Sequence, residues 1–213
     1  MKNLIIIGAG GFAREVYWNA QKTEGFNSDW KIKGFLDGDV KLSDEDYKKL
    51  PEGIAVLGDV DNYEICNDDV FTCAVGTPEV RKKLIEKMLN RGAKFINLIS
   101  RNANILPTAK IGNGVMIWFN SFISDNVQIG DYSLISASTI IGHDVKIGKY
   151  CCIMAHVDVN GWSEVGDNVF IGSHAAICPK SKIEDNAYIG IGSIVLKKVR
   201  AGKKVFAQAA IEF

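Results

Sequence analysis

A six-residue repeat of apolar positions runs through the second half of the chain. Every sixth residue from Ile105 to Val195 is Ile or Val, and the residue four places further on is always small or slim. Because side chains alternate across a strand, both positions of each repeat point to the same side and can fill one interior. The period predicts a parallel β-solenoid in which each repeat forms one short strand and one turn.

Three repeats should make one coil of this solenoid. Residues eighteen apart would then lie one above the other, about 4.8 Å apart, and residues 105–200 would form roughly five coils. Seven repeats carry glycine directly after the aliphatic residue, where positive φ would let the backbone turn a corner. A sandwich of alternating strands is the other fold with short strands, but it would not keep one phase for about ninety residues.

The first part of the chain has the pattern of a small α/β domain. Strands are expected over 2–7, 30–36, 54–57, 70–75 and 94–99, and helices over 12–21, 43–50 and 78–91. This alternation predicts a parallel sheet with helices packed on it. A complete dinucleotide-binding fold needs about six strands, and fewer are available here. We expect a Rossmann-like domain over residues 1–98 and the solenoid over residues 99–213.

A glycine-rich turn joins the first strand to the first helix. The run from Gly8 through Gly10 and Gly11 to Ala13 fits the dinucleotide fingerprint G-x-G-x-x-A. N–H groups at a helix N-terminus bind phosphate, and Asp37, at the end of the second strand, can accept from a ribose or a base. These residues predict a nucleotide site; the alternative is that the glycines only permit a tight turn. Nicotinamide chemistry is not favoured, because the second mononucleotide half is missing.

His143 is the leading candidate for chemistry. It falls on a predicted corner, with Asp125 one coil below and Gly161 one coil above. An outward imidazole with a carboxylate to orient it, and with a backbone N–H near a developing oxyanion, has the groups that acyl transfer needs. Asp144, the next residue, is a second candidate partner. A solvated histidine in a turn is the alternative interpretation.

The other two histidines, His156 and His174, are eighteen residues apart and should stack in successive coils. Two imidazoles suggest half of a zinc site, but they fall on a different corner from His143, so a third ligand would have to come from another subunit. A stacked polar edge or a subunit contact is the other interpretation. Cys151 is expected in the core, and Cys152 is expected to point outward, where it could react.

Charge and composition disfavour several classes of protein. The 25 basic and 25 acidic residues cancel, which argues against nucleic acid or an anionic membrane as a partner. No apolar run near the start is long enough for a signal peptide or a spanning helix. Five cysteines without CxxC spacing do not suggest a disulfide framework or a structural zinc site. We expect a soluble, cytoplasmic protein with no metal.

With these features in hand, the chain resembles the bacterial sugar-nucleotide N-acetyltransferases of the hexapeptide-repeat superfamily, such as the enzyme of the bacillosamine pathway. Sialic acid O-acetyltransferases have the same layout. The marks of the resemblance are the GAGGFAREV opening, the segment from Val75-Gly76-Thr77 to Arg81-Lys82-Lys83, and an acid after His143. The resemblance covers nearly the whole chain, and it implies that the solenoid is a left-handed β-helix.

The resemblance also implies an activity and a set of site residues. It implies a homotrimer that transfers acetyl from acetyl-CoA to the 4-amino group of a UDP- or dTDP-linked amino-deoxy sugar. The histidine matching His143 is the general base, and the acid matching Asp144 tunes it. The positions that follow acetyl-CoA match Gly161, Gly190 and Ile191. The positions that hold the nucleotide sugar match Gly8, Gly10, Gly11, Asp37 and Gly76.

The chain departs from the family pattern at two places near the expected site. Phe12 stands where the family often has histidine, and Cys152 stands where the bacillosamine enzyme has a second site histidine. Three rival functions stay open at this point. They are O-acetylation of a sugar hydroxyl such as that of sialic acid, a zinc lyase of the γ-carbonic anhydrase kind, and a non-catalytic scaffold that binds nucleotide.

Overall fold

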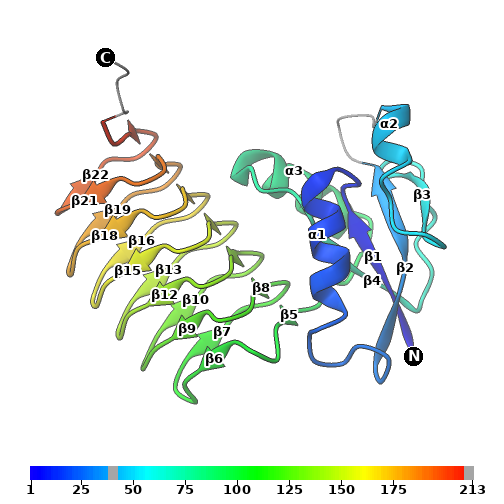
Figure 1. Cartoon of the computed structure of the whole chain (residues 1–213), viewed down its shortest axis with the longest axis horizontal. Helices are drawn as coiled ribbons and strands as arrows, with labels where there is room; N and C mark the ends of the chain where they lie inside the picture. Colours follow the sequence, from blue (N-terminus) through cyan, green and yellow to red (C-terminus); the bar gives the residue numbers. More distant parts are fainter. Residues whose placement is uncertain (38–42, 209–213) are drawn as a thin grey trace. The chain divides into compact units, whose positions relative to one another are not determined.

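The computed structural model describes residues 1–37 and 43–208 and divides into two compact units, Met1–Arg101 and Asn102–Phe213 (Figure 1). The first unit is a parallel sheet with the strand order β3-β2-β1-β4. Its strands are β1 (Lys2–Ile7), β2 (Trp30–Asp37), β3 (Ala55–Asp59) and β4 (Asp69–Cys73). Its helices are α1 (Gly11–Ala20), α2 (Asp44–Tyr47) and α3 (Pro78–Asn90).

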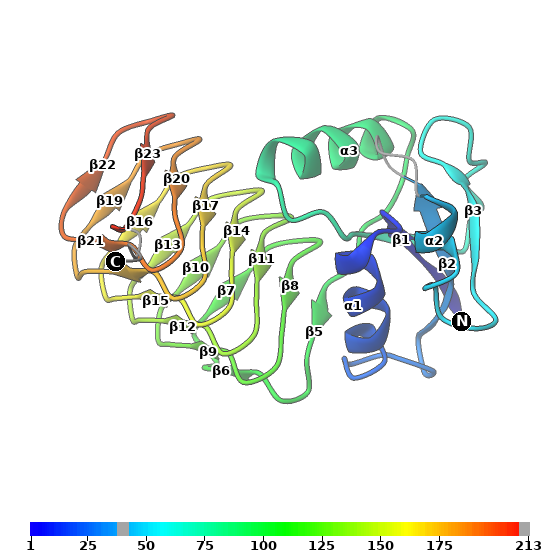
Figure 2. The ribbon, with the colours of Figure 1, turned by 45° about the horizontal axis from the view of Figure 1, so that its top comes forward.

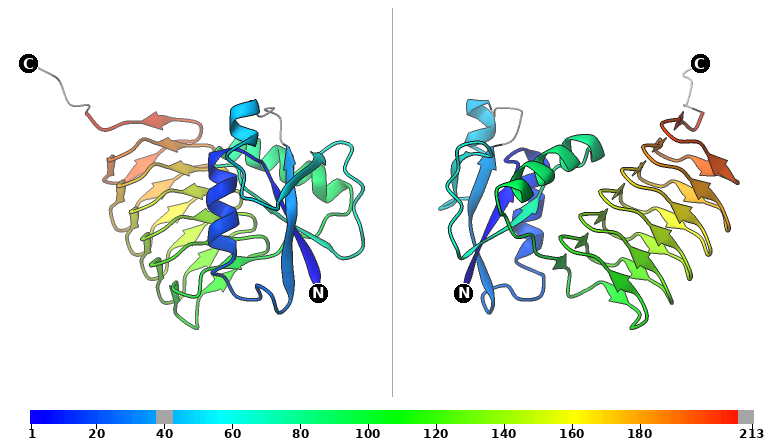
Figure 3. Two further views of the ribbon diagram at one scale, coloured as in Figure 1. Left: turned by 45° about the vertical axis from the view of Figure 1, so that its right-hand side comes forward. Right: turned by 180° about the vertical axis from the view of Figure 1, so that it is seen from behind.

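The core of this unit lies on both sides of β1. Figures 1 and 3 show α1 on one side of the sheet and α3 on the other. The apolar run from Leu4 to Ile7 has no exposed surface, because β1 is flanked by β2 and β4 and covered by helices. This continuous apolar run is typical of a strand in a parallel sheet that is buried on both faces.

Two elements of the first unit are shorter than the sequence predicts. The helix expected over 43–50 is reduced to the short α2, and the strand expected over 94–99 is reduced to β5 (Leu98–Ile99). Residues 94–96 still run beside β4: the Phe71 N–H donates to the Lys94 carbonyl at 2.9 Å, and the Ile96 N–H donates to the Phe71 carbonyl at 3.2 Å. The sheet is therefore extended at this edge by one bridge and not by a full strand.

The second unit is a parallel β-solenoid built from two-residue strands, and Figure 2 shows its stacked coils. The first face consists of β6 (Asn104–Ile105), β9 (Phe122–Ile123), β12 (Ile140–Ile141), β15 (Asp158–Val159), β18 (Ala176–Ile177) and β21 (Ile194–Val195). The second face consists of β7 (Lys110–Ile111), β10 (Gln128–Ile129), β13 (Lys146–Ile147), β16 (Glu164–Val165), β19 (Lys182–Ile183) and β22 (Lys198–Val199). The third face contains β8 (Met116–Ile117), β11 (Leu134–Ile135), β14 (Cys152–Ile153), β17 (Phe170–Ile171), β20 (Tyr188–Ile189) and β23 (Lys204–Val205). We call the turns that follow first-, second- and third-face strands the first, second and third corners.

The predicted interior and register are confirmed over most of the solenoid. Leu134 pairs with Cys152, eighteen residues on, and the inward positions are buried from Val115 to Val195. The phase changes in the last coil, where Lys182 pairs with Lys198, sixteen residues on. The last turn is two residues shorter, so Val199 occupies an aliphatic position opposite Ile183 and not the slim position that the repeat predicts.

The prediction that glycine turns the corners through positive φ was wrong. Positive φ occurs two residues later, and twelve repeats place a residue other than glycine there: Asn120, Asn126, Tyr132, Ser138, Asp144, Tyr150, His156, Trp162, Asn168, His174, Lys180 and Asn186. Glycine directly after the aliphatic residue is needed for space instead. A Cβ on Gly130 would lie 2.6 Å from the carbonyl carbon of Gly148 in the next coil. The coils stack too closely there for a side chain.

Candidate active site

His143 lies on the first corner, in the turn between β12 and β13. The turn is tied to both neighbouring coils, since the Asp144 N–H donates to the Asp125 carbonyl at 2.9 Å and the Gly142 N–H donates to the Val159 carbonyl at 2.8 Å. The His143 side chain is 46% exposed. A rigid backbone therefore presents an accessible imidazole.

Asp144, and not Asp125, is the carboxylate that contacts His143. The His143 Nδ1 lies 2.9 Å from the Asp144 Oδ2, while the Asp125 carboxylate accepts from the Thr108 hydroxyl at 2.5 Å. The second Asp144 oxygen accepts from the Asn126 amide at 2.7 Å. The hydrogen bond from Asn126, and then the one with His143, hold the pKa of the Asp144 carboxyl below its usual value. An ionised carboxylate thus orients the ring through Nδ1.

Gly161 lies directly against the other nitrogen of the ring. A Cβ on Gly161 would come 2.7 Å from the His143 Nε2 and 2.8 Å from its Cε1. Gly161 therefore lies one coil above His143, as predicted, and the imidazole occupies the space that a side chain at position 161 would need. Any side chain at position 161 would displace the imidazole.

Trp162 is a neighbour of His143 that the sequence interpretation missed. Its ring centroid lies 4.3 Å from that of His143, with the planes at 90°. The eighteen-residue spacing places Trp162 one coil above Asp144, so the contact was open to prediction. The orientation of the indole toward His143 depends on its rotamer, which periodicity does not determine.

Gly190 and Ile191 lie on a different corner from His143 and Gly161. They follow β20 on the third corner, where Ile191 is 69% exposed. A Cβ on Gly190 would lie 2.6 Å from the Phe206 Cδ1 and 3.1 Å from the Val205 carbonyl oxygen, so a side chain there would have to displace the Phe206 ring. Of the three residues predicted to contact acetyl-CoA, a single chain therefore places Gly161 beside His143 but not Gly190 or Ile191.

The stacking of His156 and His174 on the third corner is as predicted. Their ring centroids are 4.8 Å apart and their planes are within 4° of parallel. Zinc binds histidine nitrogen at about 2.0–2.1 Å, and two parallel rings at this separation do not converge on one ion. Within residues 1–37 and 43–208, no three His, Cys, Asp or Glu side chains are grouped so that they could hold a metal ion.

The cysteine predictions are half right. Cys151 is buried as expected, and burial raises the pKa of its thiol to about 12. Cys152 was expected to be accessible, but it is fully buried in β14, between Leu134 and Phe170 of the adjacent strands. Neither thiol has the exposure that a nucleophile needs.

The predicted nucleotide-binding residues gather at one edge of the parallel sheet, the edge formed by the carboxyl ends of its strands. β1 runs into Gly8, β2 ends at Asp37, and the segment after β4 leads to Gly76, so all three positions lie at the carboxyl ends of strands. The strand order reverses between β1 and β4, and ligands of open α/β sheets bind at such a switch point.

The glycines at this edge have separate roles. Gly8 has φ of 101°, and a Cβ there would lie 3.1 Å from the Ala74 carbonyl oxygen, so both conformation and space require glycine. Gly10 precedes α1 without a side-chain cap, and a Cβ on it would meet nothing within 4 Å. The N-terminus of α1 is therefore open to a ligand.

Arg81 supports the backbone at the same edge of the sheet. This α3 residue is fully buried, and its guanidinium donates to the Cys73 carbonyl and, at 3.3 Å, to the Val75 carbonyl. It thereby holds the end of β4 and the start of the segment that contains Gly76. The sequence marked Arg81 only as part of a family segment.

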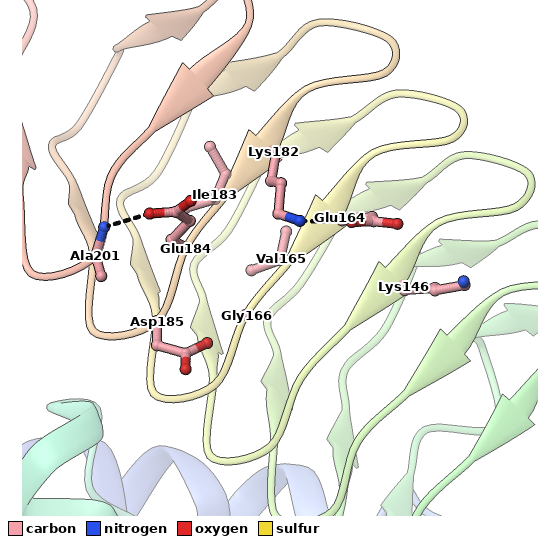
Figure 4. A pocket seen from close by; sticks show the side chains of 9 residues that line it. All are labelled: Lys146, Glu164, Val165, Gly166, Lys182, Ile183, Glu184, Asp185 and Ala201. Atoms are coloured by element: carbon pink, nitrogen blue, oxygen red, sulfur yellow. Dashed lines mark hydrogen bonds and ion pairs between the residues drawn. The ribbon is translucent and has the colours of Figure 1, made fainter.

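A separate groove of about 510 Å³ lies on the second face of the solenoid (Figure 4). Two of its charged side chains form an ion pair, in which the Lys182 Nζ lies 3.4 Å from the Glu164 Oε2, and the Ala201 N–H donates to the Glu184 carboxylate at 3.0 Å. None of its lining residues belongs to the first corner. We assign it no part in the chemistry of His143.

Comparison with known families agrees with both units. Residues 3–88 match the PglD N-terminal domain, and residues 126–161 and 144–179 match the bacterial transferase hexapeptide (six repeats). UDP-N-acetylbacillosamine N-acetyltransferase of Bacillus subtilis (strain 168) is 30% identical over 120 residues, which is 55% of this chain and 51% of that protein. The resemblance to sugar-nucleotide N-acetyltransferases is confirmed. The chain spans about half the length of this curated relative. The solenoid is the left-handed β-helix of hexapeptide repeats, as predicted.

Solved structures support the fold over almost the whole chain. The acetyltransferase domain of PglB from Neisseria gonorrhoeae FA1090, in complex with acetyl coenzyme A, is 22% identical with a TM-score of 0.84, covering 97% of this chain and 96% of that one. PerB from Caulobacter crescentus, in complex with CoA and GDP-perosamine, is 22% identical with a TM-score of 0.81, covering 97% of this chain and 95% of that one. In the part of this chain that the structure describes, no helix has the length and apolar character to cross a membrane.

Proposed function

We propose that the protein transfers acetyl from acetyl-CoA to the 4-amino group of a nucleotide-linked amino-deoxy sugar in the cytoplasm. The observation that carries this proposal is the 2.9 Å contact between the His143 Nδ1 and Asp144, on an exposed corner where Nε2 faces Gly161. The Bacillus subtilis relative is named as a sugar-nucleotide N-acetyltransferase, and the PglB and PerB structures hold acetyl coenzyme A or CoA. These names support the choice of donor and acceptor.

In the proposed reaction, the His143 Nε2 accepts a proton from the amine as the amine nitrogen attacks the thioester carbonyl. The new N–C bond forms, the C–S bond breaks, and the proton passes to the leaving thiolate, so the products are an amide and the free thiol of CoA. Asp144 orients the ring and stabilises the imidazolium. The Gly161 N–H stabilises the oxyanion that forms on the thioester carbonyl oxygen. Transfer is direct, and the burial of Cys151 and Cys152 agrees with a route without an acyl-cysteine.

We also propose a homotrimer and a divided binding site. Gly190 and Ile191 of one chain would contact the acetyl-CoA that reacts beside His143 of a neighbouring chain, because one chain places these residues on different corners. The nucleotide would bind at the sheet edge, with phosphate at the N–H groups of Gly10 and Gly11 and with Asp37 accepting from a hydroxyl. Gly8 and Gly76 would shape that edge.

The test uses the purified chain with acetyl-CoA and a panel of UDP- and dTDP-linked 4-amino sugars. Thiol release reports turnover, and mass spectrometry of the product separates an amide from an ester. A thermal-shift panel identifies the nucleotide, since a ligand at a hundred times its Kd adds about 2.7 kcal/mol of stability. We expect N-acetylation, and His143→Ala should lower kcat at least a hundredfold, the usual scale for a general base. Acetylation of hydroxyl acceptors only, near-normal turnover of the variant, or stoichiometric tightly bound zinc would each contradict the proposal.

A further inference from the structure

Trp162 is bound to the His143 turn through both its backbone and its ring. Its N–H donates to the His143 carbonyl at 3.0 Å, and its indole meets the imidazole at right angles with centroids 4.3 Å apart. Perpendicular aromatic contacts of this length are stabilising. Trp162 nevertheless remains 54% exposed. Trp162 therefore restrains one side of the imidazole and leaves much of its own surface accessible.

Lys180 lies one coil above Trp162 on the same corner. Its Nζ is 5.5 Å from the centroid of the indole ring, within the range of a cation–π contact. Its backbone N–H donates to the Gly161 carbonyl at 3.0 Å. The first corner thus carries, in three successive coils, an imidazole, an exposed indole and an ammonium group.

The indole and the ammonium group match two parts of a nucleotide-linked deoxy sugar. A deoxy sugar has an apolar ring face that can lie on an exposed aromatic surface, and the phosphate attached directly to the sugar is an anion that an ammonium group attracts. We infer that Trp162 is a positioning residue for the His143 imidazole and that Trp162 and Lys180 together bind the acceptor sugar nucleotide. This inference rests on the proposed acetyl transfer and adds the residues that select the acceptor.

The test compares Trp162→Asn and Trp162→Phe. Asparagine suits the positive φ of this turn position, since Asn126 occupies it on the first corner and Asn120, Asn168 and Asn186 occupy it on the other corners, so the variant removes the indole without straining the turn. We expect Trp162→Asn to raise KM for the sugar nucleotide at least tenfold and to lower kcat, with KM for acetyl-CoA changed less than twofold. Phenylalanine should restore most of both losses. Lys180→Met should raise KM for the sugar nucleotide and weaken its salt dependence.

Tyr150→Asn is the matched control. Tyr150 has φ of 58° and is also an aromatic residue at the positive-φ position, but it lies on the second corner. Its variant should keep the kinetic constants of the wild type. A rise in KM for acetyl-CoA in Trp162→Asn, or equal losses in Tyr150→Asn, would overturn the inference.

A spectroscopic measurement separates this inference from the proposed function. Protonated imidazole quenches indole fluorescence, so the tryptophan emission of the wild-type protein should decrease as the pH is lowered. This decrease should be lost in both His143→Asn and Trp162→Phe. If no acetyl transfer is found, calorimetric binding of the same sugar nucleotides replaces KM. Equal affinity in wild type and Trp162→Asn would then refute the acceptor contact, and a quenching step unaffected by His143→Asn would refute the positioning contact.

Discussion

The His143 Nε2 and the backbone of Gly161 are so close that one added methyl group on Gly161 would lie 2.7 Å from the nitrogen. The imidazole is a side chain and can rotate away from such a group. At corners where an added methyl group would meet the backbone of the next coil, the backbone cannot move away in the same manner. This difference separates the effect of a glycine substitution on activity from its effect on stability.

Gly161→Ala should therefore lower kcat at least tenfold while changing the free energy of unfolding little. Gly130→Ala is the control, because its Cβ would lie 2.6 Å from the carbonyl carbon of Gly148 on the second corner. Overpacking against backbone costs about 1–3 kcal/mol, so this variant should lose stability and keep its kcat at low temperature. Steady-state kinetics and urea unfolding measure both effects. Equal kcat in the two variants would show that the ring position is unimportant.

Removal of the Asp144 carboxylate should change the pH profile of the reaction. The lowered pKa of Asp144 keeps this carboxyl ionised at every pH where the enzyme is assayed, so its own protonation does not produce the acidic limb of the profile. Asp144→Asn removes the charge that stabilises a protonated imidazole, and the acidic limb of kcat/KM should move to lower pH as kcat falls about tenfold or more. Asn126→Ala, which removes the 2.7 Å hydrogen bond to Asp144, should give a smaller effect in the same direction. A profile identical to that of the wild type would exclude Asp144 as the partner.

Asp69 should make stability pH-dependent. Burial alone would raise the pKa of its carboxyl, but hydrogen bonds from the Cys66 N–H, Lys33 and Tyr63 hold this pKa below the usual value. The folded pKa lies below the unfolded value of about 3.9, so the stabilisation is complete above that pH and is lost as pH falls through the folded pKa. Asp69→Asn should cost about 2 kcal/mol at pH 7. Urea unfolding at pH 7 and pH 3 should show this difference shrinking in acid; a difference that grows would contradict the assignment.

Arg81→Met should destabilise the first unit and weaken nucleotide binding together. The variant leaves the Cys73 and Val75 carbonyls without their guanidinium donor, and an unsatisfied buried acceptor costs about 1–3 kcal/mol. Lys82→Met, on the same helix, removes an exposed pair in which the Lys82 Nζ lies 3.9 Å from the Glu86 carboxylate, and it should change stability by less than about 0.5 kcal/mol. Thermal shifts with and without nucleotide sugar measure both quantities. If nucleotide sugar raised the Tm of Arg81→Met as much as it raises that of the wild type, Arg81 would have no role in nucleotide binding.

The six-residue period alone determined the solenoid, its interior and the eighteen-residue stacking, because strand alternation and coil length repeat along the chain. The glycine-rich opening likewise determined a turn at the carboxyl end of β1. Tertiary structure decided what depends on a neighbouring coil. It selected Asp144 over Asp125 as the partner of His143, turned Trp162 toward the imidazole, buried Cys152, and gave the corner glycines a steric role. Side-chain rotamers and close backbone contacts are set by residues eighteen or more positions away, and a periodic pattern does not contain them.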